Sequence, residues 1–336
     1  MVDLYLGSAP IKLDDAPPHG DFVVRDDESY YRIRHFDRMP PFLISLTSGG
    51  NHWMYLSSTG GLTCGRKSPE NALFPYTTDD KVHDAYTTTG PQTVFRVNRG
   101  SRKLLWKPFS DQVPLYVCER SLYKNLPGNR IVYEEINHDL GLVFSYEWST
   151  CERYGFVRKV SLRNLSGQEV ELDLLDGIRN LLPYGVEPLA QSTLSTLIDG
   201  YKQAERVPQL PAAIFSLSSI LSDRAEPSEA LKATVVWGLG LEESRILVSE
   251  DQVRAFCLGE EPSEETFKRG KRGAFYVNAS VSIPSQEAVE WYLVADINQG
   301  AAQLTGLVED LHRSIDPATV DKEIEVGQET LKKLVG

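Results

Sequence analysis

The chain has 336 residues, of which 41% are hydrophobic and 10% aromatic, and it carries a formal net charge of -12. That composition is typical of a globular protein with a large core and one or two domains. The acidic balance argues against nucleic acid or an anionic membrane surface as a partner. The sequence contains no run of about 18 apolar residues, so it predicts no membrane-spanning helix.

The first residues, MVDLYLGSAPIKLDD, lack the basic start and apolar run of a signal peptide. Cys64, Cys118, Cys151 and Cys257 are far apart in the sequence and form no C-x-x-C pair. Such spacing in a chain of this length is typical of reduced thiols. We therefore expect a cytoplasmic protein.

Most of the chain has the period-2 alternation of apolar and polar residues that predicts β-strands. The alternating runs are residues 30–36, 93–98, 130–136, 141–149, 156–178 (two runs), 232–240, 245–249, 274–283 and 288–297. So many strands with few helices between them predict antiparallel sheets packed as a large two-sheet sandwich.

Three short segments have the composition of hairpin connections. Residues 137–140, Asn-His-Asp-Leu, separate two strand runs, and residues 164–167, Asn-Leu-Ser-Gly, separate another two with residues that tolerate positive φ. The basic segment 267–273, FKRGKRG, is interpreted as a solvated hairpin turn.

Two regions have helical spacing. Residues 186–207 place apolar side chains at Leu189, Leu194, Leu197, Ile198 and Tyr201, which predicts a helix or a helix mixed with an excursion. The tail predicts two helices, within residues 299–315 and 316–336. Asp316 and Pro317 are the N-cap and first-turn proline of the second.

Motifs of nucleophilic, nucleotide-binding or metal chemistry are weak here. Gly61-Leu62-Thr63-Cys64-Gly65 has Thr at the centre, where a nucleophile elbow needs Ser on a strand-to-helix turn. Residues 238–240, Gly-Leu-Gly, lack the third glycine of a dinucleotide site. The six histidines show no pair at ligand spacing, so we expect neither a metal nor a cofactor.

Carboxylates are candidates for an acid/base pair, and tryptophans are candidates for stacking on sugar rings. Glu134 and Glu135 are neighbours on a predicted strand, so they point to opposite faces and cannot serve one site. Tryptophans within alternating strands are expected in the core. We expect Trp53, beside His52, and Trp106 to be exceptions that could stack on a sugar ring.

The segment 53–80, WMYLSSTGGLTCGRKSPENALFPYTTDD, resembles the N-terminal region of the cellobiose phosphorylase and cyclic β-1,2-glucan synthase family of inverting, glycosyltransferase-36-like glycoside phosphorylases. The matching features are Gly60-Gly61, Arg66, Ser68, Glu70-Asn71, Pro75-Tyr76 and Asp79-Asp80. Segments 154–178 and 222–241 are also similar to this domain, the first to its middle hairpin. One departure is GLTCGR, which replaces the aromatic of the family's "GYTW"-like strand.

The resemblance implies a mainly β fold, a large antiparallel two-sheet supersandwich of the galactose-mutarotase-like type with a C-terminal helical linker. Residues 1–298 would form the sandwich domain, and residues 299–336 would lead into an (α/α)6 catalytic domain. In this family the general acid and the phosphate site belong to that helical domain, and no position here matches them. We therefore expect no catalytic residue in this chain and inorganic phosphate only as a co-substrate of the full-length enzyme.

The implied function is that of a non-catalytic N-terminal domain of an enzyme acting on β-linked gluco-oligosaccharides. Such a domain supplies scaffold, a homodimer surface and an edge of the sugar site; its partners are an oligosaccharide and a helical catalytic domain, in cis or as a separate subunit. The substrate-binding candidates are His52, Trp53, Arg66, Glu70, Asn71, Tyr76, Asp79 and Asp80. Alternatively this segment is a structural loop in which Asn71 and Asp79 bond backbone in turns.

Two other functions remain open at this point. One is a freestanding carbohydrate-binding module, and the other is a mutarotase-like epimerase built on a His/Glu pair supplied by His83, His138 and Glu134. A domain separated from its partner would expose an apolar stripe on the tail helices, whereas a standalone module would bury it. The stripe would consist of Leu304, Leu307, Leu311, Leu331 and Leu334.

Overall fold

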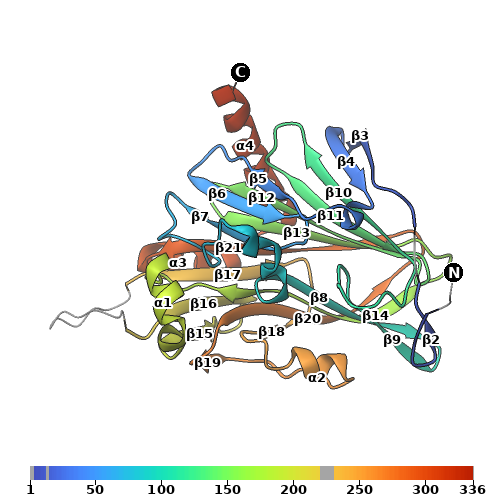
Figure 1. Ribbon diagram of the computed structural model, residues 1–336. Coiled ribbons are helices and arrows are strands. Elements are labelled where there is room, and N and C mark those ends of the chain that lie inside the picture. Colours follow the sequence, from blue (N-terminus) through green and yellow to red (C-terminus); the bar gives the residue numbers. More distant parts are fainter. Residues whose placement is uncertain (1–3, 13–14, 220–230, 336) are drawn as a thin grey trace.

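The computed structural model describes residues 4–12, 15–219 and 231–335 (Figure 1). Within these residues the strands form an 11-stranded, a five-stranded, a three-stranded and a two-stranded sheet, in which all neighbouring strands pair antiparallel. The expected mainly β fold class, with large antiparallel sheets, is confirmed. Residues 222–230 of the segment 222–241 and Gly336 lie outside the described residues.

The large sheet runs in the order β19-β15-β16-β17-β21-β13-β12-β11-β10-β4-β3. Its strands are β3 (His19–Arg25), β4 (Glu28–Arg34), β10 (Cys118–Asn125), β11 (Ile131–Asn137), β12 (Leu142–Cys151), β13 (Gly155–Asn164), β15 (Lys202–Arg206), β16 (Ala212–Leu217), β17 (Ala233–Leu239), β19 (Phe267–Arg269) and β21 (Ala288–Gln299). The predicted hairpin at residues 137–140 is confirmed, because β11 and β12 pair across it.

The five-stranded sheet contains β18 (Arg245–Leu247), β20 (Gly273–Ile283), β14 (Val170–Leu181), β8 (Gly90–Arg99) and β9 (Arg102–Trp106). The small sheets contain β5 (Leu43–Leu46), β6 (His52–Ser57) and β7 (Leu62–Arg66), and β1 (Tyr5–Leu6) and β2 (Ala9–Pro10). The helices are α1 (Pro188–Asp199), α2 (Val253–Cys257), α3 (Ala301–His312) and α4 (Pro317–Val335), with 3-10 turns η1 (Phe36–Arg38), η2 (Asp80–His83) and η3 (Ala85–Thr87). None of these helices is both long and apolar enough to cross a membrane.

The main core lies on the inner face of the large sheet. Phe144 and Trp148 of β12 point into it with Val160 of β13, as their period-2 spacing predicts. Both smaller sheets pack onto this face: Phe95 of the five-stranded sheet and Met54 of the three-stranded sheet belong to the same buried cluster. The two smaller sheets therefore cover different parts of one large sheet.

One charged pair interrupts this apolar core. Arg158 of β13 and Asp176 of β14 have fully buried side chains and form a bidentate ion pair between the two main sheets, with N···O distances of 2.7 and 3.0 Å. Asp176 also accepts hydrogen bonds from Trp291 Nε1 at 2.7 Å and Thr93 Oγ1 at 2.5 Å. Since each carboxylate oxygen has two donors, the charge is compensated by hydrogen bonds as well as by Arg158.

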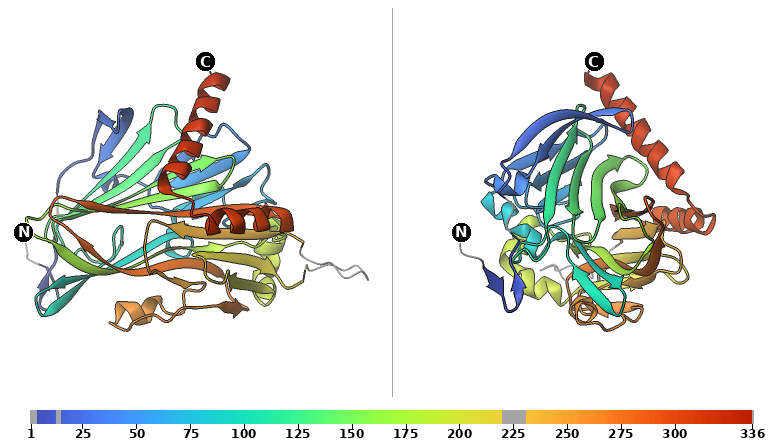
Figure 2. Two further views of the ribbon diagram at one scale, coloured as in Figure 1. Left: turned by 180° about the vertical axis from the view of Figure 1, so that it is seen from behind. Right: turned by 90° about the vertical axis from the view of Figure 1, so that its right-hand side faces the viewer.

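The tail helices cover the central part of the outer face of the large sheet (Figure 2). Leu307 and Leu311 of α3 pack against the second buried cluster, and Leu331 of α4 is only 8% exposed. Leu304 is half-buried, whereas Leu334 near the C-terminal end is 71% exposed. Most of the predicted apolar stripe is therefore docked on the sandwich. The division into residues 1–298 and 299–336 stays a prediction.

Two of the predicted hairpins are wrong. Residues 164–167 do not join paired strands: β13 lies in the large sheet and β14 in the five-stranded sheet, so the turn crosses between layers. Buried Asn164 fixes this crossing, because its amide donates to the carbonyls of Gln168, Ile283 and Pro284. Residues 267–273 likewise cross from β19 to β20, in different sheets.

The region 186–207 proves to be mixed. Residues 188–199 form α1, and residues 202–206 form strand β15. Asp316 caps α4 as expected, since its carboxylate accepts from Thr319 N at 2.7 Å. Cys64 is a core residue with no exposed surface, and burial raises the pKa of its thiol well above the usual value.

The buried ion pair gives a direct test of what joins the sheets. The Asp176→Asn variant would keep the side-chain shape but leave the Arg158 charge without a counter-charge, so we expect a loss of about 3 kcal/mol or more of unfolding free energy. Urea denaturation followed by tryptophan fluorescence measures it. Asp21→Asn, at the half-exposed pair with Arg32, is the control and should lose much less; equal losses would contradict the assignment.

Candidate functional site

A cleft lies on the inner side of the large sheet, between residues of the three-stranded and five-stranded sheets. It has two adjoining chambers with volumes of about 280 and 270 Å³. Each lies near the lower limit of roughly 300–1,000 Å³ that is typical of ligand pockets. The chambers share five wall residues, which are Thr59, Tyr86, Phe109, Asp111 and Tyr146.

The first chamber, called the polar chamber here, is lined by side chains from several distant segments. Gln92 and Thr93 come from β8, Lys107 from the loop after β9, and Arg179 from β14. Amide, hydroxyl and cationic groups thus converge on one small space. Such groups orient a polar ligand through hydrogen bonds.

The second chamber, called the aromatic chamber here, has a more apolar lining. Phe36, Met39 and Pro41 line it from the segment between β4 and β5, and Tyr133 from β11. Asp37 and Arg120 add one charge of each sign. The pairing of apolar faces with a few polar groups is the usual composition of a site for small organic ligands.

Two tyrosines form the floor of the cleft. Tyr133 and Tyr146 are directly paired across β11 and β12, and their rings stack with centroids 5.0 Å apart. The Arg158 guanidinium lies 4.7 Å from the centroid of the Tyr146 ring, so the buried ion pair supports the floor from below. Burial raises the pKa of both tyrosines, which keeps them protonated at neutral pH.

Two loops meet over the opening. Tyr86 Oη of η3 donates a 2.7 Å hydrogen bond to Asp111 Oδ2 of the loop after β9. Arg179 Nη2 donates to the Tyr86 carbonyl at 2.5 Å and so holds η3 onto the five-stranded sheet. Asp111 is exposed, so the contact between the two loops lies at the surface of the cleft.

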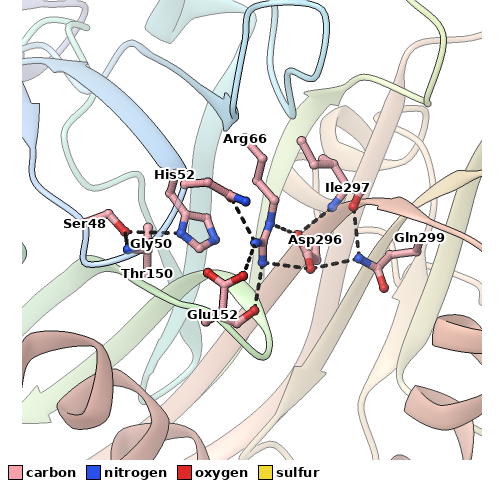
Figure 3. Close-up of polar contacts among 10 residues, drawn as sticks. Ser48, Gly50, His52, Arg66, Thr150, Glu152, Asp296, Ile297 and Gln299 are labelled. Atoms are coloured by element: carbon pink, nitrogen blue, oxygen red, sulfur yellow. Dashed lines mark hydrogen bonds and ion pairs between the residues drawn. The ribbon is translucent and has the colours of Figure 1, made fainter. Parts of the chain in front are cut away.

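The predicted residue Arg66 lies in a different place, at the centre of a polar cluster (Figure 3). Its guanidinium makes two hydrogen bonds to Asp296 of β21, at 2.8 and 3.1 Å, and its Nη2 donates to the Glu152 carbonyl at 3.0 Å. Burial raises the pKa of Asp296, while the Arg66 charge lowers it. Arg66 thus joins the three-stranded sheet to the large sheet.

His52 belongs to the same cluster but is buried. Its Nδ1 lies 3.2 Å from Ser48 Oγ, and its ring packs edge-on against Phe156. Its Nε2 is buried and has no hydrogen-bond partner. Burial, together with the nearby Arg66 charge, lowers the pKa of His52 to about 3, so the ring is neutral at physiological pH.

Five of the other six predicted residues are spread along the segment after β7, and the sixth, Trp53, lies in β6. Asn71 accepts from Asn298 Nδ2 at 2.7 Å and Asp79 caps η2 by accepting from Lys81 N. Glu70 and Asp80 are exposed. Tyr76, 38% exposed, meets the half-buried Trp53 edge-on at 5.5 Å.

None of the eight predicted residues lines either chamber. Asp79 bonds backbone, as the structural-loop alternative has it, whereas the Asn71 side chain bonds the side chains of Ser68 and Asn298. The role of the loop as an edge of a sugar site stays a prediction. The hypothesis that Trp106 is an exposed platform is wrong: it is 2% exposed, and its Nε1 donates to Glu135 in the core.

The trio suggested for an epimerase is not brought together. Glu134 accepts from Tyr123 and Arg25, and His83 Nδ1 lies 2.8 Å from Ser57 Oγ. His138 is exposed in the β11–β12 turn. In the part of the chain that the structure describes, no hydrogen bond or ion pair joins any two of these three side chains.

Sequence reasoning missed the cleft because its walls come from separate segments spread over residues 36–179. Two signals were present in the sequence. Tyr133 and Tyr146 lie on either side of a correctly predicted hairpin, at positions that pair across it. The Lys107-Pro108-Phe109-Ser110-Asp111 segment combines an aromatic residue with polar ones directly after a strand.

No protein-family model and no curated protein sequence matches this chain. Among solved structures, a bacterial glucoamylase complexed with acarbose is similar with a TM-score of 0.51 and 9% identity, over 99% of this chain and 40% of that one. A putative kojibiose phosphorylase from the human microbiome (TM-score 0.38, 8% identity, 91% of this chain and 32% of that one) and a putative aldose 1-epimerase from Escherichia coli K12 (0.40, 9%, 77% and 100%) are less similar.

The glucoamylase similarity shows a shared fold, and the other two are too slight to carry an argument. The chain therefore shares its fold with the part of the glucoamylase that it matches. The chain spans about 40% of the length of the glucoamylase.

The Arg66 cluster predicts a stability effect. In Arg66→Ala, Asp296 would keep a buried carboxylate without its bidentate partner, so we expect roughly 3 kcal/mol of destabilisation, measured by urea denaturation. Arg153→Ala is the control, because its pairs with Asp310 and Glu323 are far more exposed. A loss for Arg66→Ala no larger than that of the control would contradict the structural role.

His52 predicts a pH effect. Its pKa is about 3 in the folded chain but about 6.5 when unfolded, so the unfolded state binds the proton first as the pH falls. Stability from this group is therefore lost between pH 6.5 and 3, at about 1.4 kcal/mol per pH unit. Urea denaturation at pH 7 and pH 4.5 should show a larger loss of unfolding free energy for the native chain than for His52→Gln. Equal losses in the two chains would refute the assigned pKa shift of His52.

Proposed function

We propose that this chain is the sandwich domain of a carbohydrate-active enzyme and that it binds an oligosaccharide in the cleft between its two smaller sheets. The observation that carries the proposal is the two-chamber cleft itself. Sugar rings have an apolar face and a rim of hydroxyls. The aromatic floor and the converging polar side chains of the chambers complement these two surfaces.

The fold supports the same proposal. A bacterial glucoamylase whose structure was solved with acarbose shares the fold over 99% of this chain. Because the chain corresponds to only 40% of that protein, we propose that it works beside a helical catalytic domain, in cis or as a separate subunit. That domain would supply the general acid and use inorganic phosphate as co-substrate.

The finer assignment follows the sequence resemblance. We propose an inverting phosphorylase or glycosyltransferase acting on β-linked gluco-oligosaccharides, with this chain non-catalytic and giving scaffold, a homodimer surface and one edge of the sugar site. The edge would be the loop from Arg66 to Asp80. Its exposed Tyr76 ring, braced by Trp53, is the surface there best suited to a sugar.

Sugar binding can be measured directly by isothermal titration calorimetry with glucose, cellobiose and cellotriose. We expect cellobiose to bind, and Lys107→Ala and Asp111→Ala to weaken it about tenfold, equivalent to about 1.4 kcal/mol. Both residues line the polar chamber and are not buried, so the fold should persist.

Lys322→Ala is the matched control, because Lys322 is an exposed lysine on α4. It should leave the affinity unchanged. Asp80→Ala separates the loop from the cleft, since Asp80 is exposed and lines neither chamber. Loss of binding in Asp80→Ala but not in Lys107→Ala would move the site to the loop, and no binding of any of the three sugars would overturn the proposal.

A further inference from the structure

The wall shared by the two chambers has an unusual backbone. Phe109, which lines both chambers, has φ of +57°. Among the described residues other than glycine, ten more have positive φ, and all ten have polar or charged side chains. A bulky apolar residue in the left-handed region is strained and persists only where its surroundings hold it there.

Glu135 holds the Phe109 backbone in this conformation. One of its carboxylate oxygens accepts from the Phe109 backbone N–H at 2.7 Å and from Arg120 Nε at 2.8 Å. The other accepts from Trp106 Nε1 at 2.8 Å. Glu135 is 1% exposed, so these charge-assisted bonds form away from water, where they are strongest.

The clamp is anchored in the large sheet. Glu135 of β11 and Arg120 of β10 are directly paired across the two strands. Arg120 Nη2 also donates to the Ser110 carbonyl at 2.8 Å. Bonds from one cross-strand pair thus fix Trp106, Phe109 and Ser110, the segment that leaves the five-stranded sheet at the end of β9.

The held conformation decides where the Phe109 ring lies. The ring packs against Tyr146 at 5.5 Å, Phe144 at 6.1 Å and Tyr133 at 6.3 Å between centroids. It therefore rises from the aromatic floor at the boundary of the two chambers. Glu135 does not line either chamber, so any effect it has on a ligand acts through this loop or through Arg120, which lines the aromatic chamber.

We propose that Glu135 is a positioning residue of the cleft. By holding Phe109 in the left-handed conformation, it makes the phenyl ring the partition between two adjacent chambers, each of which accepts one sugar ring. The cleft is thereby built for two consecutive sugar units. This inference rests on the proposed function for the nature of the ligand, whereas the hold of Glu135 on Phe109 is independent of it.

The ligand test uses Glu135→Gln. A glutamine side chain is uncharged and accepts through only one oxygen, so it presents an N–H to at least one of the three donors and its hold on the loop should weaken. We expect cellobiose affinity to fall about tenfold while glucose affinity changes little, because only the disaccharide spans the partition. Cleavage by chymotrypsin after Phe109 should become faster in the same variant.

Glu134→Gln is the matched control. It makes the same chemical change at the neighbouring position of β11, where the carboxylate points to the opposite face and bonds Tyr123 and Arg25. We expect its cellobiose affinity and its chymotrypsin resistance to equal those of the native chain. Equal behaviour of Glu134→Gln and Glu135→Gln in both assays would overturn the inference.

A third measurement needs no ligand. Glycine adopts φ of +57° freely and alanine does not, so Phe109→Gly should melt at a higher temperature than Phe109→Ala while Glu135 is present. In the Glu135→Gln background, where the loop is free to relax, that advantage should vanish. A Phe109→Ala variant at least as stable as Phe109→Gly in the native background would overturn the hold on Phe109.

These measurements distinguish failure of the proposed sugar binding from failure of the positioning role of Glu135. If the native chain binds no cellobiose but the glycine advantage and the protease contrast are found, the proposed function fails and the positioning role of Glu135 stands. If cellobiose binds but Glu135→Gln leaves its affinity and the protease pattern unchanged, the proposed function stands and the positioning role fails.

Discussion

The ion pair between Arg158 and Asp176 is the interaction on which the rest of the structure depends. It is an ion pair that joins the two main sheets, and both side chains are fully buried. A charge placed there is tolerated only if every lone pair finds a donor, and Trp291 and Thr93 complete that set. The requirement fixes how β13, β14, β8 and β21 lie against one another.

The cleft follows from that arrangement. Because the five-stranded and three-stranded sheets cover different parts of the inner face of the large sheet, a seam between them leaves Tyr133 and Tyr146 reachable. Arg158 lies under the Tyr146 ring, so the joint between the sheets is also the support of the floor. Stability and the shape of the site are thus properties of the same few side chains.

A second joint holds the three-stranded sheet in place. Arg66 reaches from β7 to Asp296 of β21, and the loop beside it packs closely on α4: a Cβ on Gly49 would lie 2.7 Å from the Gly327 carbonyl. The tail helix therefore contacts the same region that Arg66 fixes. The three-stranded sheet therefore connects α4, which packs on the loop before β6, to Thr59, which lines the cleft after β6.

The sequence by itself determined many strands of the two largest sheets, the tail helices and the mainly β class, because period-2 and 3.6-residue patterns are local consequences of burying one face. It could not assign partners to strands: residues 164–167 have the composition of a hairpin, yet they cross between sheets, since pairing is decided by distant strands. For the same reason only the tertiary structure revealed the cleft, whose walls come from separate segments spread over residues 36–179. It also showed that Arg66, which has the residue type of a ligand-binding group, uses its guanidinium to bond Asp296 and so holds two sheets together.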